Sequence, residues 1–286
     1  MILSCTSPNQ TPSFEIITGE GITGEVIKYQ FFPSDFVLAR NVEVWLPPSY
    51  HINPDQRFPV LYMHDGQNVF NPATSYTGVD WNIDGTLTQL IEQGLAREVI
   101  VVAPWNTERR RGEYMPAKPL QETDGVAAFE VEYGTLYSDA YLKFLVTELK
   151  PFIDSNYRTL SNTENTIIMG SSMGGLISAY AIAQYPEIFG KAGCISTHWT
   201  IGGNSLVDWL SSELPGPGNH FIYFDYGTEG IDAPYEPYQL RLNQALLDRG
   251  FQEGIDFVSY RFDGDDHNES AWNARMHIPL KYLLRK

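Results

Sequence analysis

A short segment rich in glycine and serine is the first candidate for chemistry. Residues 170–174 read Gly-Ser-Ser-Met-Gly, a G-x-S-x-G pattern that makes Ser172 the candidate nucleophile. The pattern follows the apolar run 166–169, typical of a strand, and precedes a run with helical spacing. Small residues beside the serine permit a sharp strand-to-helix turn that projects its hydroxyl. The segment therefore predicts acyl transfer through a covalent serine intermediate.

A serine hydroxyl needs a general base, and His267 is the histidine best placed to supply one. It follows the last predicted strand, 257–262, in the sequence Gly-Asp-Asp-His-Asn-Glu. A second histidine, His198, follows a strand end and could border the pocket, although a structural role is the simpler interpretation.

The acid that would orient this histidine is expected in the turn after the strand 221–226. Asp232 and Glu229 are both candidates there. We favour Asp232, because an aspartate several residues beyond a Gly-Thr turn commonly lies at the sheet edge, and Glu229 stays open as the alternative. The resulting order of serine, acid and histidine is the order in α/β-hydrolases rather than in other serine-protease scaffolds.

Two backbone N–H groups are the candidates for stabilising an oxyanion. One belongs to Met173, directly after the nucleophile, and the other to Gln67 in the loop after an early strand. Gly66 would let this loop approach closely. The neighbouring His64 and Asp65 have no partners at metal-ligand spacing, so we do not predict a metal site.

The elements that must position these residues alternate along the chain. Short apolar runs typical of buried strands lie at 59–64, 99–103, 166–169 and 221–226, with 257–262 as one more. Helical spacing appears at 84–93, 138–157, 173–184, 237–249 and 271–284. This alternation predicts a doubly wound, mostly parallel α/β sheet, and the β-rich runs 26–32 and 37–46 predict an N-terminal antiparallel hairpin at its edge. We expect a single domain over 15–286 after a flexible tail, 1–14.

One long segment, 105–135, does not fit this alternation. It is rich in aromatic residues but lacks a clear period, which predicts an irregular, ordered wall over the site. Trp105 and Tyr114 within it are candidate stacking surfaces for a substrate ring. Together with His198 they make up the predicted substrate-binding residues.

Composition excludes some classes of partner. The chain has 286 residues and a formal net charge of −16, and its only basic run is 109–111, which argues against nucleic acid binding. No apolar stretch is long enough to predict a membrane span. Residues 2–5 resemble the end of a bacterial lipoprotein signal, so the cytoplasm and the cell envelope both stay open, as does the oligomeric state.

Four segments together resemble the putative esterase family of α/β-hydrolases, which includes feruloyl and acetylxylan esterases, siderophore esterases, S-formylglutathione hydrolases and mycolyltransferases. They are 62–70, 111–116, 170–175 and 264–272. The resemblance implies a triad of Ser172, an acid and His267, without a cofactor, that hydrolyses small or sugar-linked acyl esters. The Asp-Gly-Gln-Asn form of the early loop differs from the formylglutathione group and disfavours that substrate. Two alternatives stay open. One is a serine peptidase or acyltransferase of the same fold, and the other is a non-catalytic carbohydrate- or siderophore-binding protein.

Overall fold

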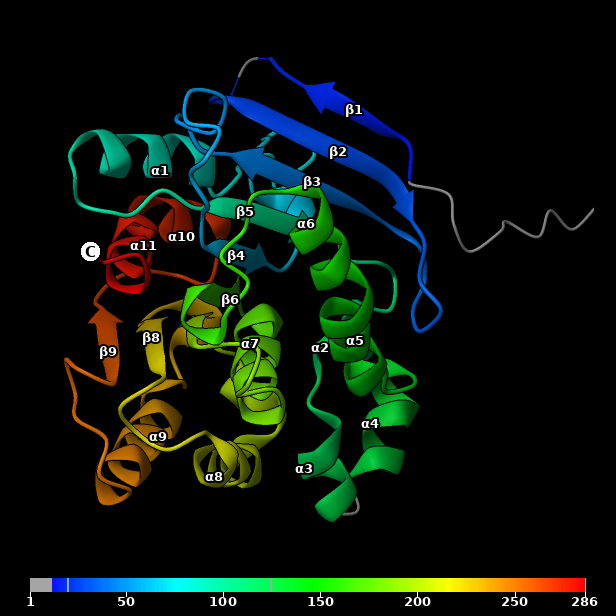
Figure 1. The fold of residues 1–286 in the computed structure, drawn as a ribbon. Coiled ribbons are helices and arrows are strands. Elements are labelled where there is room, and N and C mark those ends of the chain that lie inside the picture. Colours follow the sequence, from blue (N-terminus) through cyan, green and yellow to red (C-terminus); the bar gives the residue numbers. More distant parts are fainter. Residues whose placement is uncertain (1–11, 20, 124, 286) are drawn as a thin grey trace, which may run out of the picture.

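The computed structural model describes residues 12–19, 21–123 and 125–285, and within them a single large sheet forms the centre of the molecule (Figure 1). Its strands run in the order β1-β2-β3-β5-β4-β6-β7-β8-β9. They are β1 (Phe14–Ile17), β2 (Glu25–Phe32), β3 (Arg40–Leu46), β4 (Val60–Met63), β5 (Ile100–Pro104), β6 (Thr166–Ser171), β7 (Lys191–Ile195), β8 (Phe221–Gly227) and β9 (Phe257–Phe262).

The sheet changes from antiparallel to parallel at β5. The pairs β1/β2, β2/β3 and β3/β5 are antiparallel, and all pairs from β5/β4 to β8/β9 are parallel. The predicted α/β-hydrolase fold, with its N-terminal antiparallel hairpin, is therefore confirmed. Strand β1, which extends the hairpin, was not predicted.

Helices cover both faces of the sheet (Figure 1). On one face lie α1 (Ile83–Glu92), α10 (Glu269–Arg275) and α11 (His277–Leu283). The other face is covered by α5 (Ser138–Phe144), α6 (Lys150–Asn156), α7 (Met173–Gln184), α8 (Gly203–Glu213) and α9 (Glu236–Asp248). Successive strand residues point to opposite faces. In β5, Ile100 and Val102 accordingly join one core, and Val101 and Ala103 join the other.

The predicted helices are present with small differences. The expected helix 138–157 consists of α5, a π-helical turn (Leu145–Leu149) and α6, and the expected helix 271–284 is divided into α10 and α11. Helix α8 was not predicted.

The segment 105–135 is a correction to the sequence analysis, because it is not irregular. It contains three short helices, α2 (Arg110–Tyr114), α3 (Ala117–Glu122) and α4 (Val126–Tyr133). The first two span little more than one turn, too short to show a helical period. In α4, Val131 is 90% exposed while Phe129 is buried, so the apolar residues do not form one stripe. We call these three helices, with their connections, the wall.

The N-terminal predictions fall mostly outside the described residues. The resemblance to a lipoprotein signal lies at residues 2–5, and most of the expected tail, 1–14, is also outside. Phe14, which was assigned to the tail, already belongs to β1. Among the described helices, none combines the length and apolar character needed to cross a membrane.

Candidate active site

Ser172 occupies a strained turn between β6 and α7. Its backbone is left-handed, with φ 59° and ψ −122°, a conformation that non-glycine residues rarely adopt. The turn is tight, because a Cβ at Gly170 would lie 2.9 Å from the backbone of Gly174. The N–H of Ser172 donates to the carbonyl of Ile195 on the next strand, at 2.8 Å. The local sequence therefore holds the serine at the carboxyl edge of the sheet, as the G-x-S-x-G pattern predicts.

His267 reaches this serine from the loop between β9 and α10. Its Nε2 lies 2.8 Å from Oγ of Ser172, and its ring packs edge-on against Trp272 with centroids 4.9 Å apart. The loop ends where the Asn268 side chain caps α10 by accepting from the N–H of Ala271 at 3.0 Å. The cap and the ring contact both restrict the position of the histidine.

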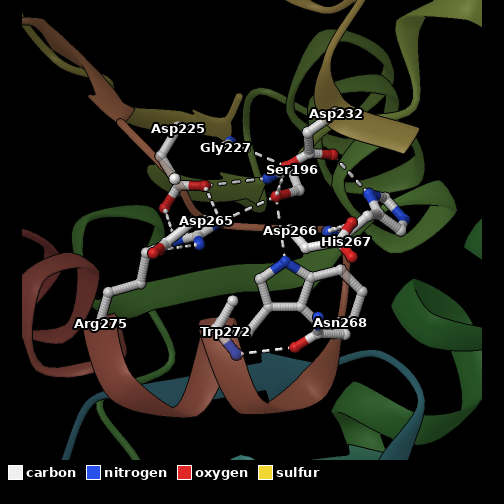
Figure 2. A network of polar contacts seen from close by, with 12 residues as sticks. Ser196, Asp225, Gly227, Asp232, Asp265, Asp266, His267, Asn268, Trp272 and Arg275 are labelled. Atoms are coloured by element: carbon white, nitrogen blue, oxygen red, sulfur yellow. Dashed lines mark hydrogen bonds and ion pairs between the residues drawn. The ribbon is translucent and has the colours of Figure 1, made fainter. Parts of the chain in front are cut away.

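Asp232 contacts the opposite side of the same imidazole (Figure 2). Its Oδ1 lies 2.5 Å from Nδ1 of His267, and its Oδ2 accepts from Oγ of Ser196 at 2.6 Å and from the N–H of Gly227 at 2.8 Å. Burial raises the pKa of this carboxyl, but the contacts with His267, Ser196 and Gly227 outweigh burial and leave the pKa below its usual value. The other candidate acid, Glu229, is exposed.

A second layer of polar contacts supports Asp232, and no motif in the sequence indicated it. Ser196, directly after β7, accepts from Nε1 of Trp272 at 3.0 Å and from Nη2 of Arg275 at 2.8 Å. Arg275 also binds Asp225 in β8, at 3.1 Å, and Asp265 in the loop that carries His267, at 2.7 Å (Figure 2). The arginine thus connects the strand, the loop and the helix around the imidazole.

The early loop lies against the turn that carries Ser172. A Cβ built on Gly174 would lie 3.4 Å from Cβ of His64. Gly66 is required here, because a Cβ at this position would lie 2.2 Å from the carbonyl oxygen of Ala103. Within the described residues, the N–H groups of Gln67 and Met173 donate no hydrogen bond. Two free donors from adjoining segments are therefore available near the serine.

An ion pair with a buried carboxylate fixes this loop to the wall. Asp65, which has a left-handed backbone with φ 58°, binds Arg110 of α2 through both oxygens, at 2.6 and 2.8 Å. Oδ1 also accepts from the Asn106 side chain at 2.6 Å. Its N–H donates to the hydroxyl of Tyr114 at 3.2 Å. The pKa of Asp65 is lowered, because Arg110 and Asn106 together outweigh the effect of burial.

The structure separates the three predicted substrate-binding residues. Tyr114 is completely buried, so its ring has no face for a substrate, and that expectation is wrong for this structure. Trp105 packs under Nζ of Lys28 at 4.3 Å, on the side of the N-terminal hairpin. His198 does lie beside His267, with ring centroids 6.2 Å apart, and its Nδ1 contacts the hydroxyl of Tyr235. Burial is the main cause that lowers its pKa to about 4, with His267 and Arg110 contributing.

The side chains of His64 and Asp65 both bind other residues of the protein. Nδ1 of His64 lies 2.8 Å from the hydroxyl of Tyr141, and Asp65 binds Arg110. In the described part of the chain, no group of three or more His, Cys, Asp or Glu side chains is arranged to hold a metal ion.

Comparison with known proteins identifies the family. The model of the family described as Putative esterase matches residues 38–278. Two sequence relatives are the uncharacterised protein YbbA of Bacillus subtilis and an endo-1,4-beta-xylanase/feruloyl esterase of Xylanibacter ruminicola. YbbA is 27% identical over 220 residues, covering 75% of this chain and 80% of YbbA. The second is 24% identical over 278 residues, covering 92% of this chain but 32% of the relative.

Solved structures share the fold at lower identity. An IroE-like serine hydrolase from Shewanella oneidensis matches with a TM-score of 0.69 and 18% identity, over 90% of this chain and 79% of that one. A ferulic acid esterase matches with a TM-score of 0.65 and 20% identity, over 91% of this chain and 98% of that one. With a family match over most of its length, this chain belongs to the Putative esterase family and is a hydrolase that acts on ester bonds.

Proposed function

We propose that this chain is a serine carboxylesterase that uses Ser172, His267 and Asp232 as its catalytic triad. The observation that carries the proposal is the continuous chain of contacts from Oγ of Ser172 through the imidazole to Oδ1 of Asp232, at 2.8 and 2.5 Å. Both distances are within hydrogen-bond reach, as proton transfer from the serine to a base requires.

The reaction begins when Nε2 of His267 takes the proton of the Ser172 hydroxyl and Oγ attacks the ester carbonyl. The N–H groups of Met173 and Gln67 donate to the oxyanion that forms. His267, now protonated and held by the carboxylate of Asp232, returns the proton to the departing alcohol, leaving an acyl-enzyme. Water then attacks the acyl group, with the same histidine as its base, and Ser172 is regenerated.

The proposed substrates are small or sugar-linked acyl esters. Two proteins with similar sequence or structure are named as feruloyl or ferulic acid esterases, and a third, from Shigella flexneri, is named as an enterobactin esterase. Those names describe esters of aromatic acids and a siderophore, and they guide the choice of test substrates for this chain. A panel of acetyl, butyryl, feruloyl and triserine-lactone esters ranks these classes by kcat/KM.

The test compares two adjacent serines. Ser172→Ala should lower turnover of 4-nitrophenyl acetate by several orders of magnitude and abolish labelling by a fluorophosphonate probe. Ser171→Ala is the matched control, because Ser171 is the preceding residue and is buried. Undiminished turnover or labelling in Ser172→Ala would overturn the proposal. Assays with peptide substrates and with alcohol acceptors distinguish an esterase from a peptidase or an acyltransferase.

A further inference from the structure

A basic pocket lies in the wall, outside the triad. It has a volume of about 490 Å³ and is lined by the three consecutive arginines 109–111 and by Tyr133 and Tyr137, among others. These residues come from the start of α2, the end of α4 and the connection to α5, which lie on the same face of the sheet (Figure 1). Three adjacent arginines stand out in a chain whose net charge is −16.

Two of the arginines are held in place by aromatic rings. The guanidinium of Arg109 lies 4.7 Å from the ring centroid of Tyr137, and that of Arg111 lies 4.9 Å from that of Tyr133. The backbones on the two sides of the pocket are also joined, because the N–H of Tyr137 donates to the carbonyl of Gly112 at 2.8 Å. The guanidinium groups are therefore oriented before any ligand arrives, which lowers the entropy cost of binding.

The guanidinium charges of Arg109 and Arg111 are not neutralised by ion pairs in the described part of the chain. Arg110 is paired with Asp65, but in the described part of the chain neither Arg109 nor Arg111 has a carboxylate within 4.0 Å. One acidic residue, Glu108, lines the pocket and is exposed. A planar guanidinium presents two parallel N–H donors that match the oxygens of a carboxylate or a phosphate.

The pocket is connected to the reaction site through Arg110. This residue lines the pocket and also binds Asp65, next to Gly66 and the Gln67 N–H. The charges of Arg110 and Arg111 also contribute to the lowered pKa of His198, beside His267. Arg110 thus belongs both to the basic pocket and to the contacts that hold the loop with the Gln67 N–H.

We infer that this pocket binds a carboxylate or phosphate group carried by the ester substrate at a distance from the bond that is cleaved. The inference rests on the proposed function and adds a substrate class to it: esters with an anionic group. The bidentate contacts of Arg109 and Arg111 hold that group, and the aromatic rings keep the two guanidinium groups in position.

Two series of esters test the inference. The first contains mono-4-nitrophenyl esters of linear dicarboxylic acids from succinic to sebacic acid, each compared with the neutral 4-nitrophenyl ester of equal chain length. Increasing length samples the span between Ser172 and the pocket. The second carries the charge on the alcohol side, with 4-acetoxybenzoate and 4-acetoxyphenyl phosphate compared with neutral 4-acetoxybenzamide. Its two anionic members separate a carboxylate ligand from a phosphate ligand.

The decisive variant is Arg109→Gln/Arg111→Gln. For at least one anionic ester, we expect the wild type to have a higher kcat/KM than for its neutral partner. The double variant should lose about tenfold more on that ester than on the neutral one, mainly through KM. The charge-matched control is Arg241→Gln/Arg261→Gln, because both of these side chains are 49% exposed and lie on α9 and β9. It should behave as the wild type.

Two outcomes would overturn the inference. One is the absence of any anionic preference in both series, and the other is an equal loss on charged and neutral esters in the double variant. Failure of the proposed function has a different sign. In that case, Ser172→Ala would still turn over the neutral esters.

Discussion

The hydroxyl of Ser196 donates a hydrogen bond of 2.6 Å to Oδ2 of Asp232, the oxygen that does not face His267. A hydroxyl has one proton and two acceptor positions. In Ser196 both acceptor positions are used, by Nε1 of Trp272 and by Nη2 of Arg275, so its proton is directed at Asp232 (Figure 2). The network therefore determines the position of the carboxylate. It also determines that Oδ1, and not Oδ2, faces the imidazole.

Ser196→Ala should reduce catalysis without removing any group of the proposed triad. Asp232 loses one of its hydrogen bonds, and the buried Nε1 of Trp272 loses its acceptor, which costs about 1–3 kcal/mol of unfolding free energy. We expect kcat for 4-nitrophenyl acetate to fall about tenfold with KM unchanged, and the downfield proton signal of His267 Nδ1–H to shift. Ser211→Ala is the control, because the hydroxyl of this buried serine on α8 donates to a local carbonyl, that of Asp208, at 2.8 Å. A change in unfolding free energy alone would make Ser196 purely structural.

Asp232→Asn should lower kcat by about 10³–10⁴, because an amide cannot stabilise the imidazolium and favours the wrong tautomer. Glu229→Gln makes the same chemical change three residues away, at an exposed position, and should alter kcat by less than about twofold. Steady-state kinetics of both purified variants, with circular dichroism to verify folding, decides between them. The reverse pattern would assign the acid to Glu229.

The parts of the site that depend on local sequence could be predicted. The strained turn at Ser172 follows from one strand, one pentapeptide and one helix, and the position of His267 follows from the end of the last strand. Asp232 could be favoured over Glu229 but not established as the acid, because both lie in one turn. The short 3₁₀ turn Gly230–Asp232 buries the first and leaves the second exposed.

Contacts that belong to no recognisable sequence motif could not be predicted. Ser196 meets Trp272 and Arg275 across 76 and 79 residues, and nothing near Ser196 indicates such partners. The wall was misread for a related reason. Tyr114 was expected to offer a ring to the substrate, but its contacts with Asp65 and the ring of His64 bury it completely. An aromatic residue in a long segment does not reveal from sequence which of its faces is covered.

Asp65→Asn should impair the early loop as well as stability. Removing the buried charge of this ion pair leaves Arg110 without its partner, at a cost of about 1–3 kcal/mol in unfolding free energy, because the arginine side chain is 30% exposed and can be hydrated. The loop that carries the Gln67 N–H also loses its anchor to α2, so kcat for the folded enzyme should fall about 10-fold to 100-fold.

Glu113→Gln provides the comparison for Asp65→Asn. Glu113, in the same wall, forms a more deeply buried pair with Arg40, at 2.6 Å. Breaking this pair should lower the unfolding free energy at least as much, while kcat of the folded fraction is largely kept. Urea unfolding and active-site titration, run on both variants at the same low temperature, measure the two effects separately. An equal loss of kcat in both variants would show that loss of stability, and not the position of the loop, limits the rate.

Glu43 should give the protein a pH-dependent loss of stability that is unrelated to the active site. Its side chain in β3 is 3% exposed, and burial raises its pKa to about 7, although Lys28 at 3.9 Å partly opposes this effect. In the unfolded chain the carboxyl ionises near its usual pKa of 4.5. Between these two values the unfolded state is charged and the folded state is neutral. The unfolding free energy therefore falls as pH rises through this window, by up to about 1.4 kcal/mol per pH unit.

Glu43→Gln should remove this dependence, because the amide stays neutral at every pH. We expect the variant and the wild type to differ little near pH 4.5, the variant to gain relative stability up to about pH 7, and the difference to stay constant above it. Urea unfolding at pH 4.5, 6 and 8 measures the difference. Glu92→Gln, at an exposed position on α1, makes the same change in net charge and should show no such trend. A difference that is constant from pH 4.5 to 8 would mean that Glu43 is already ionised in the folded protein at the lower pH, with Lys28 compensating for its burial.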